Sequence, residues 1–242
     1  SLSNWVFKNG NNSFILPNNA MLAPNSYLIL ANDKVSFLSW YSAYYNEDVS
    51  SQVYGNFNFG LSSDGGELIL LNAENVTVDS VDYLNVSPWP VISNPDTLSI
   101  ELVNYSFENE FGHNWYLSES YLGTPLSPSE FSSLHIGKIP NQDINLGGVF
   151  VDFDLNDFIF SPNIPVDDLL IEISGNNAIH ETISLQQIVS LSYLNWKGVE
   201  WIRFRISDTL GNFSIDSAQF LVGTILNQFP CGVIYSINQS PL

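Results

Sequence analysis

Short runs in which hydrophobic and polar residues alternate recur along the whole chain, separated by clusters of Asn, Gly, Pro and Asp. Alternation with a period of two places every second side chain on the same face, as in a half-buried β-strand. Many short strands punctuated by turn residues predict an all-β fold of the sandwich type. The clearest strands are at residues 27–30, 67–71, 76–83, 98–102 and 200–206.

Residues 35–45 depart from this alternation, because their aromatic side chains recur at the spacing of a helix. The aromatic residues are Phe37, Trp40, Tyr41 and Tyr44. One short helix is therefore expected, with Asn32 or Asp33 as its N-cap. A cluster of rings is also compatible with stacking on a carbohydrate, but helical spacing favours packing in the core.

The length of 242 residues and a 45% hydrophobic composition are enough for two ordinary domains. Residues 122–129 combine Gly and Pro without any periodic pattern and are the best linker candidate. We therefore predict one β-sandwich over residues 1–134 and a second over 135–224. Residues 225–242 are interpreted as an exit segment.

Acidic residues outnumber basic ones by 25 to six, which gives a formal net charge of -19. A nucleic acid or an anionic membrane surface is repelled by such a chain, so neither is expected as a partner. No apolar stretch approaches the roughly 18 residues of a membrane-spanning helix, so no membrane insertion is expected. Cys231 is the single cysteine and is interpreted as an inert small hydrophobic residue.

Motifs of the common catalytic classes are missing from the sequence: zinc and haem signatures, phosphate loops, nucleophile elbows and dinucleotide fingerprints. The three histidines, His113, His135 and His180, have no His, Cys or carboxylate neighbour at metal-ligand spacing and are interpreted as structural or exposed. We predict that these residues form no enzyme. The alternative from the enzyme class is a hydrolase that uses a pair of acidic side chains.

The first half of the chain carries an ordered series of motifs, beginning with Leu2-Ser3-x-Trp5. The others lie at residues 22–33, 54–62, 66–70, 78–83, 114–115 and 123–125. In this order they resemble the lamin tail domain of bacterial secreted proteins over residues 1–130. The resemblance implies a non-catalytic sandwich whose first one or two strands are missing here. An open sheet edge is then expected to pair with a preceding segment or with another chain.

Residues 139–222 resemble the cadherin-like or immunoglobulin-like repeats of bacterial surface proteins. The motifs are Ile139-Pro140-Asn141-Gln142, residues 154–158, Trp196-Lys197-Gly198 and the run from Ile202 to Gly211. Taken together, the two resemblances imply two tandem immunoglobulin-like β-sandwiches.

Aspartates are concentrated in one loop region of the second module, which makes them candidate calcium ligands. They are Asp152, Asp154, Asp157, Asp167 and Asp168. However, the resemblance implies Asp-Pro-Asp where this chain has Ser161-Pro162-Asn163, which removes two charged ligands. Calcium is the one cofactor considered.

The strand at residues 200–206 is expected to point Ile202, Phe204 and Ile206 into the core. Its outer face then carries Trp201, Arg203 and Arg205, a combination suited to binding a protein or a glycan. The alternative is that the aliphatic stems of the arginines merely cover the sheet.

Our leading hypothesis is a non-catalytic extracellular region for binding, adhesion or spacing in a secreted or cell-surface protein. The expected partner is a protein or glycan at the cell surface, or another domain of the parent chain. Two alternatives are an accessory part of a secreted hydrolase and an assembly module that pairs through its open sheet edge.

Overall fold

Strands dominate the computed structural model, which describes residues 1–92 and 98–223. In these residues α1 (Lys34–Tyr45) is the single α-helix. The predicted all-β class, with one short helix near residues 35–45, is therefore confirmed. The exit segment at 225–242, including Cys231, lies outside the described residues.

The N-terminal part is built on an antiparallel sheet with the strand order β2-β1-β5-β6. Its strands are β1 (Val6–Asn9), β2 (Asn12–Ile15), β5 (Gly65–Leu71) and β6 (Thr77–Leu84). The turn into β5 requires glycine at position 65, where φ is +130° and a Cβ atom would lie 2.7 Å from the carbonyl oxygen of Tyr83. The strands β2 and β6 form the two edges of this sheet.

Helix α1 lies between β3 (Ile29–Ala31) and β4 (Val53–Gly55), which pair in parallel. Asp33, one of the two N-caps expected from the sequence, caps the helix. It accepts a hydrogen bond of 2.9 Å from the backbone N–H of Ser36. The helix ends at Asn46, which adopts the left-handed conformation. Tyr41 of the helix packs with Val49 and Val53 in a small core.

A second pair of strands, β7 (Ile100–Leu102) and β8 (Trp115–Leu117), completes the N-terminal part. The short 3-10 helix η1 (Gly112–Asn114) leads into β8. The rings of Trp89 and Trp115 pack with centroids 5.6 Å apart. Gly112 is needed beside them, because a Cβ atom there would lie 2.6 Å from the ring of Trp89.

The C-terminal part has two main sheets, with the strand orders β10-β17-β16-β13 and β11-β15-β14. The first contains β10 (Gln142–Asn145), β13 (Leu170–Ser174), β16 (Gly198–Ser207) and β17 (Phe213–Gly223). The second contains β11 (Phe153–Asp154), β14 (Ile179–Ile183) and β15 (Ile188–Tyr193). A short pair, β9 (His135–Ile136) with β12 (Ile159–Phe160), and the 3-10 helices η2 (Leu155–Phe158) and η3 (Val166–Asp168) complete this part.

One continuous hydrophobic core lies between these two sheets, as in a β-sandwich. Ile202, Phe204 and Ile206 of β16 are fully buried in it, as the alternation along this strand predicts. Phe204 meets Phe153 of the opposite sheet, with ring centroids 5.9 Å apart. The hairpin turn after β16 is stabilised by Asp208, which accepts hydrogen bonds from the backbone of Leu210 and Asn212.

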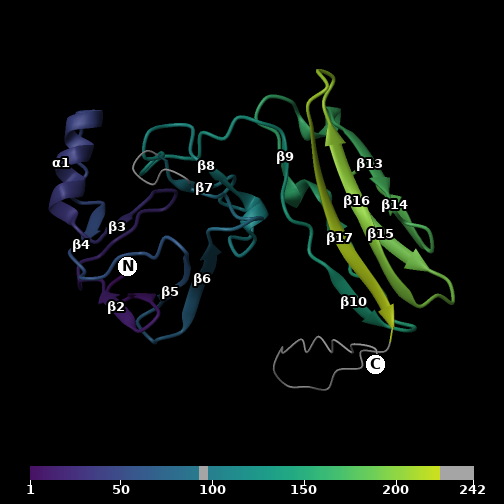
Figure 1. Ribbon diagram of the computed structural model, residues 1–242, viewed down its shortest axis with the longest axis horizontal. Helices are drawn as coiled ribbons and strands as arrows, with labels where there is room; N and C mark the ends of the chain where they lie inside the picture. The colour runs from purple at the N-terminus through teal and green to yellow at the C-terminus, as the bar shows by residue number, and fades with distance from the viewer. Residues whose placement is uncertain (93–97, 224–242) are drawn as a thin grey trace, which may run out of the picture.

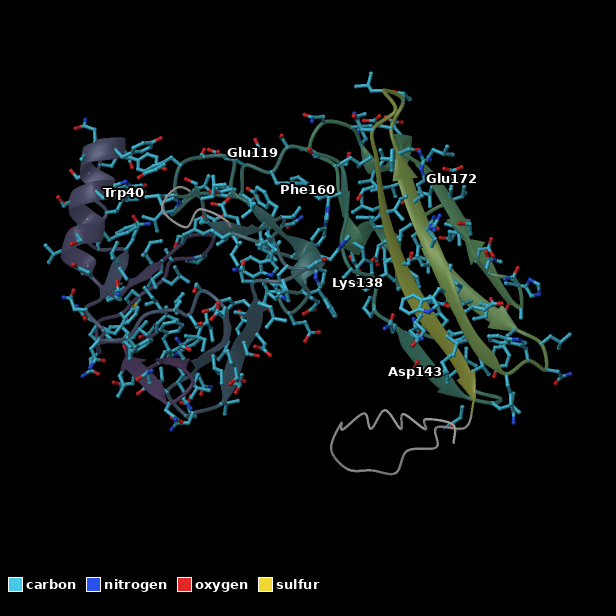
Figure 2. All side chains as sticks on the ribbon, viewed as in Figure 1. Trp40, Glu119, Lys138, Asp143, Phe160 and Glu172 are labelled. Atoms are coloured by element: carbon cyan, nitrogen blue, oxygen red, sulfur yellow. The ribbon has the colours of Figure 1, made fainter. Side chains whose placement is uncertain are left out.

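The two parts lie side by side and are joined through the segment that carries β9 (Figure 1). Trp40 of α1 marks one end of the molecule, whereas Glu172 of β13 and Asp143 of β10 mark the two edge strands of the large C-terminal sheet (Figure 2). In the described ranges, no helix has the length and apolar character needed to cross a membrane.

Candidate functional site

The five aspartates considered as calcium ligands do not converge in the structure. Asp154 caps η2 and accepts a hydrogen bond of 2.9 Å from the backbone N–H of Asn156. Asp157 lies within η2, and Asp167 and Asp168 belong to η3, where both are exposed. Asp152 is also exposed. Across residues 1–92 and 98–223, no group of three or more His, Cys, Asp or Glu side chains is arranged to hold a metal ion.

The outer face of β16 does present the predicted set of Trp201, Arg203 and Arg205. Trp201 is 56% exposed, and Arg203 is exposed as well. The side chain of Arg203 makes no hydrogen bond or ion pair with any residue that the structure describes. Two of the three predicted residues are therefore open to solvent beside each other on the strand.

Arg205 differs from Arg203, because it is already engaged within the sheet. Its guanidinium forms an ion pair with Glu172 on β13 and lies 4.8 Å from the ring centroid of Phe213 on β17. A further hydrogen bond of 3.3 Å joins it to the hydroxyl of Ser207. The alternative interpretation, a side chain that covers the sheet, thus describes Arg205.

The residues beside Trp201 and Arg203 on the neighbouring strands are small or neutral. Trp201 is paired with Gln219 of β17, and Arg203 is paired with Ser217 of β17 and Ser174 of β13. Directly paired residues in an antiparallel sheet point to the same face, so these side chains surround the two exposed ones. The centre of the face therefore combines one indole, neutral polar groups, the exposed side chain of Val199 and one guanidinium that has no partner among the described residues.

The aromatic residues of α1 divide between the two interpretations considered from the sequence. Tyr41 is buried and Phe37 packs against the same core, as core packing requires. Tyr44 is 56% exposed, stacks on Trp40 at 5.9 Å and approaches Tyr121 at 6.5 Å between ring centroids. The helix therefore supplies mainly core contacts and leaves one tyrosine on the surface.

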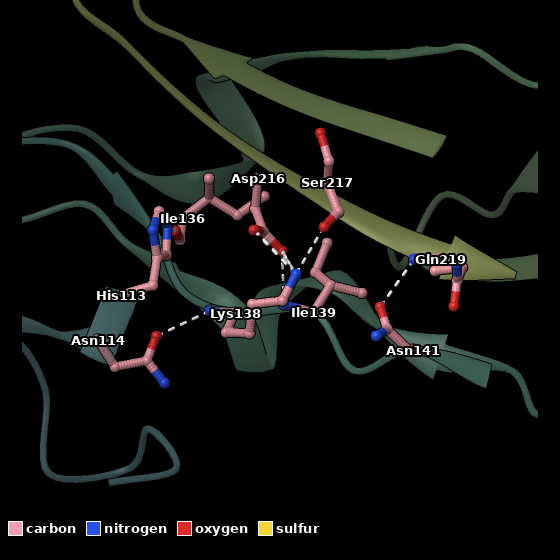
Figure 3. A network of polar contacts seen from close by, with 9 residues as sticks. All are labelled: His113, Asn114, Ile136, Lys138, Ile139, Asn141, Asp216, Ser217 and Gln219. Atoms are coloured by element: carbon pink, nitrogen blue, oxygen red, sulfur yellow. Dashed lines mark hydrogen bonds and ion pairs between the residues drawn. The ribbon is translucent and has the colours of Figure 1, made fainter. Parts of the chain in front are cut away.

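The junction between the two parts contains a polar network that the sequence alone did not indicate (Figure 3). Lys138 donates hydrogen bonds from Nζ to both carboxylate oxygens of Asp216, at 3.0 and 3.1 Å, and to the carbonyl oxygen of Ser217 at 2.6 Å. Its backbone N–H donates to Oδ1 of Asn114 at 2.8 Å. Asn114 belongs to the N-terminal part and Asp216 to β17, so Lys138 links both parts.

Asn114 and Asp216 are both buried, and each has several partners. Asn114 is 2% exposed, and its side chain also donates a hydrogen bond of 2.8 Å to the carbonyl oxygen of Glu108. Asp216 is 7% exposed and also accepts a hydrogen bond of 2.7 Å from the backbone N–H of Ile139. Buried polar groups that are satisfied in this way restrict the orientation of the segments they join.

His113 and His135 are also neighbours at this junction, with ring centroids 5.1 Å apart. The two residues are 22 positions apart in the sequence, so their contact is formed by the fold and no local motif indicates it. His113 donates from Nε2 to the carbonyl oxygen of Ile136 at 3.0 Å. Nε2 of His135 is buried without a hydrogen-bond partner among the described residues. Burial and the nearby His113 lower the pKa of His135 to about 4.

A shallow groove of about 420 Å³ runs beside the junction and is lined by Tyr27, Glu101, Tyr105 and Phe160, among others. The carboxylate of Glu101 is occupied by the chain itself. It accepts hydrogen bonds from the hydroxyl of Tyr116 at 2.7 Å and from the backbone and side chain of Thr124. Glu101 therefore anchors the segment after β8, and burial raises the pKa of Tyr116 to about 12.

Glu200, a buried carboxylate in the C-terminal part, is likewise satisfied by the chain. It accepts hydrogen bonds of 2.7 to 3.1 Å from the backbone N–H groups of Asn177, Ala178 and Ile179. These contacts hold the turn between β13 and β14. Both Glu200 and Asp216 thus have a structural explanation that involves no substrate.

Comparison with known proteins gives no match, either among protein-family models or among curated proteins.

Proposed function

We propose that the chain is a non-catalytic region of a secreted or cell-surface protein, which acts as a spacer of fixed geometry and presents a binding face. The resemblances of residues 1–130 and 139–222 to lamin-tail-like and cadherin-like modules support this role, because both families are accessory modules. The proposal includes their implication of two tandem immunoglobulin-like sandwiches in an extracellular setting.

The observation that carries the proposal is the network around Lys138. Lys138, which lies two residues after β9, is bonded to a buried side chain of each part: its backbone N–H donates to Asn114 and its Nζ donates to Asp216. A flexible tether leaves its polar groups to water, whereas these groups are directed to partners within the protein. Contacts of this kind resist rotation of one part against the other.

Small-angle X-ray scattering of the full chain tests this geometry. The wild-type chain is expected to scatter as one particle with a single arrangement of its two parts. Asn114→Ala removes the acceptor for the Lys138 N–H and should increase the radius of gyration and broaden the distance distribution. Asn9→Ala is the matched control, because the Asn9 side chain donates to the carbonyl oxygen of Gly60 within the N-terminal part.

A wild-type profile that requires an ensemble of orientations would contradict the fixed spacer. The same conclusion follows if Asn114→Ala, shown by circular dichroism to be folded, scatters like the Asn9→Ala control.

A further inference from the structure

The centre of the outer face of the large C-terminal sheet has an uncommon composition for a chain of this charge. Only six residues of the chain are Lys or Arg, and both arginines lie on this face. Arg205 is neutralised by Glu172, so Arg203 is the unpaired cation beside the exposed indole of Trp201. Trp201 and Arg203 are two residues apart, which corresponds to about 7 Å along a strand.

The surroundings of this pair offer neutral hydrogen-bonding groups. Ser174 and Ser217 lie on either side of Arg203, and Gln219 lies beside Trp201. The remaining carboxylate that the register places on this face is Asp143, on the edge strand β10 and paired with Leu221. Around the indole there are thus hydroxyl and amide groups, five guanidinium N–H donors and one apolar neighbour on the same strand, Val199, which is 46% exposed and paired with Leu221.

Charge limits the kinds of ligand that suit this face. A polyanion meets a chain with a net charge of -19 and is repelled overall. A cationic ligand is attracted by the chain as a whole, but at this face it is repelled by Arg203, whose side chain has no ion-pair partner among the described residues. A purely apolar protein surface would take the guanidinium and its neutral polar neighbours out of water without giving them partners, which is costly. A neutral ligand rich in hydroxyl groups avoids all three costs.

We propose that Trp201 and Arg203 form a binding site for a neutral polysaccharide. A sugar ring stacks its C–H face on the indole, while its hydroxyl groups accept hydrogen bonds from the guanidinium of Arg203. Ser174, Ser217 and Gln219 supply further donors and acceptors on either side. The flat sheet face suits an extended polymer more than a small molecule enclosed in a pocket. This inference deepens the binding role of the proposed function and rests on it.

Affinity electrophoresis tests the site with the full chain. Native gels contain hydroxyethylcellulose, arabinoxylan or galactomannan, and at least one of these neutral polymers is expected to retard the wild-type chain. Trp201→Ala and Arg203→Gln should each weaken the affinity at least tenfold. Two controls should be retarded like the wild type. Tyr105→Ala removes an aromatic ring that is 87% exposed in the N-terminal part, and Lys8→Gln removes a positive charge from β1.

Arg203→Gln keeps the test decisive even if Trp201→Ala folds poorly, because the Arg203 side chain has no partner to lose among the described residues. Four outcomes overturn the inference. Three concern the gels: no retardation by any neutral polymer, retardation by polygalacturonate alone, and unchanged retardation of Arg203→Gln. The fourth is concentration-dependent dimerisation abolished by Trp201→Ala, since a second copy would then cover the face.

The scattering test of the spacer is independent of these gels. Failure to bind polysaccharide together with a fixed scattering profile therefore rejects the ligand and keeps the spacer. A scattering profile of a flexible chain together with retained polysaccharide binding rejects the fixed spacer and keeps the ligand.

Discussion

At the junction, burial changes the pKa of a single residue, His135, although nothing in the sequence around it indicates this. His135 packs against the rings of Phe107, Phe131 and His113, with centroids 5.1 to 6.1 Å away. The charged and titratable group that faces it is His113, which also disfavours a positive charge on His135. The imidazole of His135 therefore stays neutral in the folded protein at pH values well below its usual pKa.

Stability should fall as the pH is lowered from about 6.5 to 4 because of His135. Its pKa is about 4 in the folded protein and 6.5 in an unfolded chain, so the unfolded state binds the proton first as the pH decreases. The loss of unfolding free energy due to His135 is zero above pH 6.5. It reaches its full value, at most about 3 kcal/mol, below pH 4. Urea unfolding at several pH values measures this loss.

His135→Phe separates this effect from the titration of the many carboxylates. The variant keeps a ring among Phe107 and Phe131 but cannot be protonated, so its stability should depend less on pH between 6.5 and 4 than that of the wild type. Parallel pH profiles for the two proteins would show that His135 takes no part in the acid response.

At the scale of the element, the two faces of β16 have different roles, since one packs in the core and the other faces solvent. Phe204 is fully buried between the sheets, whereas Trp201 is 56% exposed on the outside. Phe204→Ala should lower the free energy of unfolding by about 4 kcal/mol, because it removes core contacts and leaves a cavity. Trp201→Ala is the matched control on the same strand and should change it by no more than about 0.5 kcal/mol. Chemical denaturation measures both, and similar losses would contradict the assigned faces.

The elements themselves were largely predictable, because local pattern determines them. Alternation located β16, helical spacing located α1, and the short polar residues before the helix limited its N-cap to two candidates, of which Asp33 is used. The face of Trp201 and Arg203 follows from the same alternation. However, the pairing of Arg205 with Glu172 depends on the register between β16 and β13, which alternation does not determine.

The junction was not predictable, for a physical reason at the scale of the whole molecule. Lys138 and Asp216 are 78 residues apart in the sequence and meet only when β17 lies beside the connecting segment. Neither residue belongs to a motif. The weak signal available was the scarcity of basic residues, since each of the six in so acidic a chain is a candidate for a specific partner.

The attachment of the segment after β9 to β17 should therefore depend on the ion pair between Lys138 and Asp216. Lys138→Met leaves the buried Asp216 carboxylate with the backbone N–H of Ile139 but without its ion pair, and should cost about 3 kcal/mol. The double variant Lys138→Met with Asp216→Asn removes the uncompensated charge and retains an acceptor for Ile139, so it should recover most of that loss. Urea denaturation of the two single variants and the double variant completes the cycle. Additive losses would show that the two side chains do not act as a pair, and that packing rather than this ion pair holds the segment after β9 against β17.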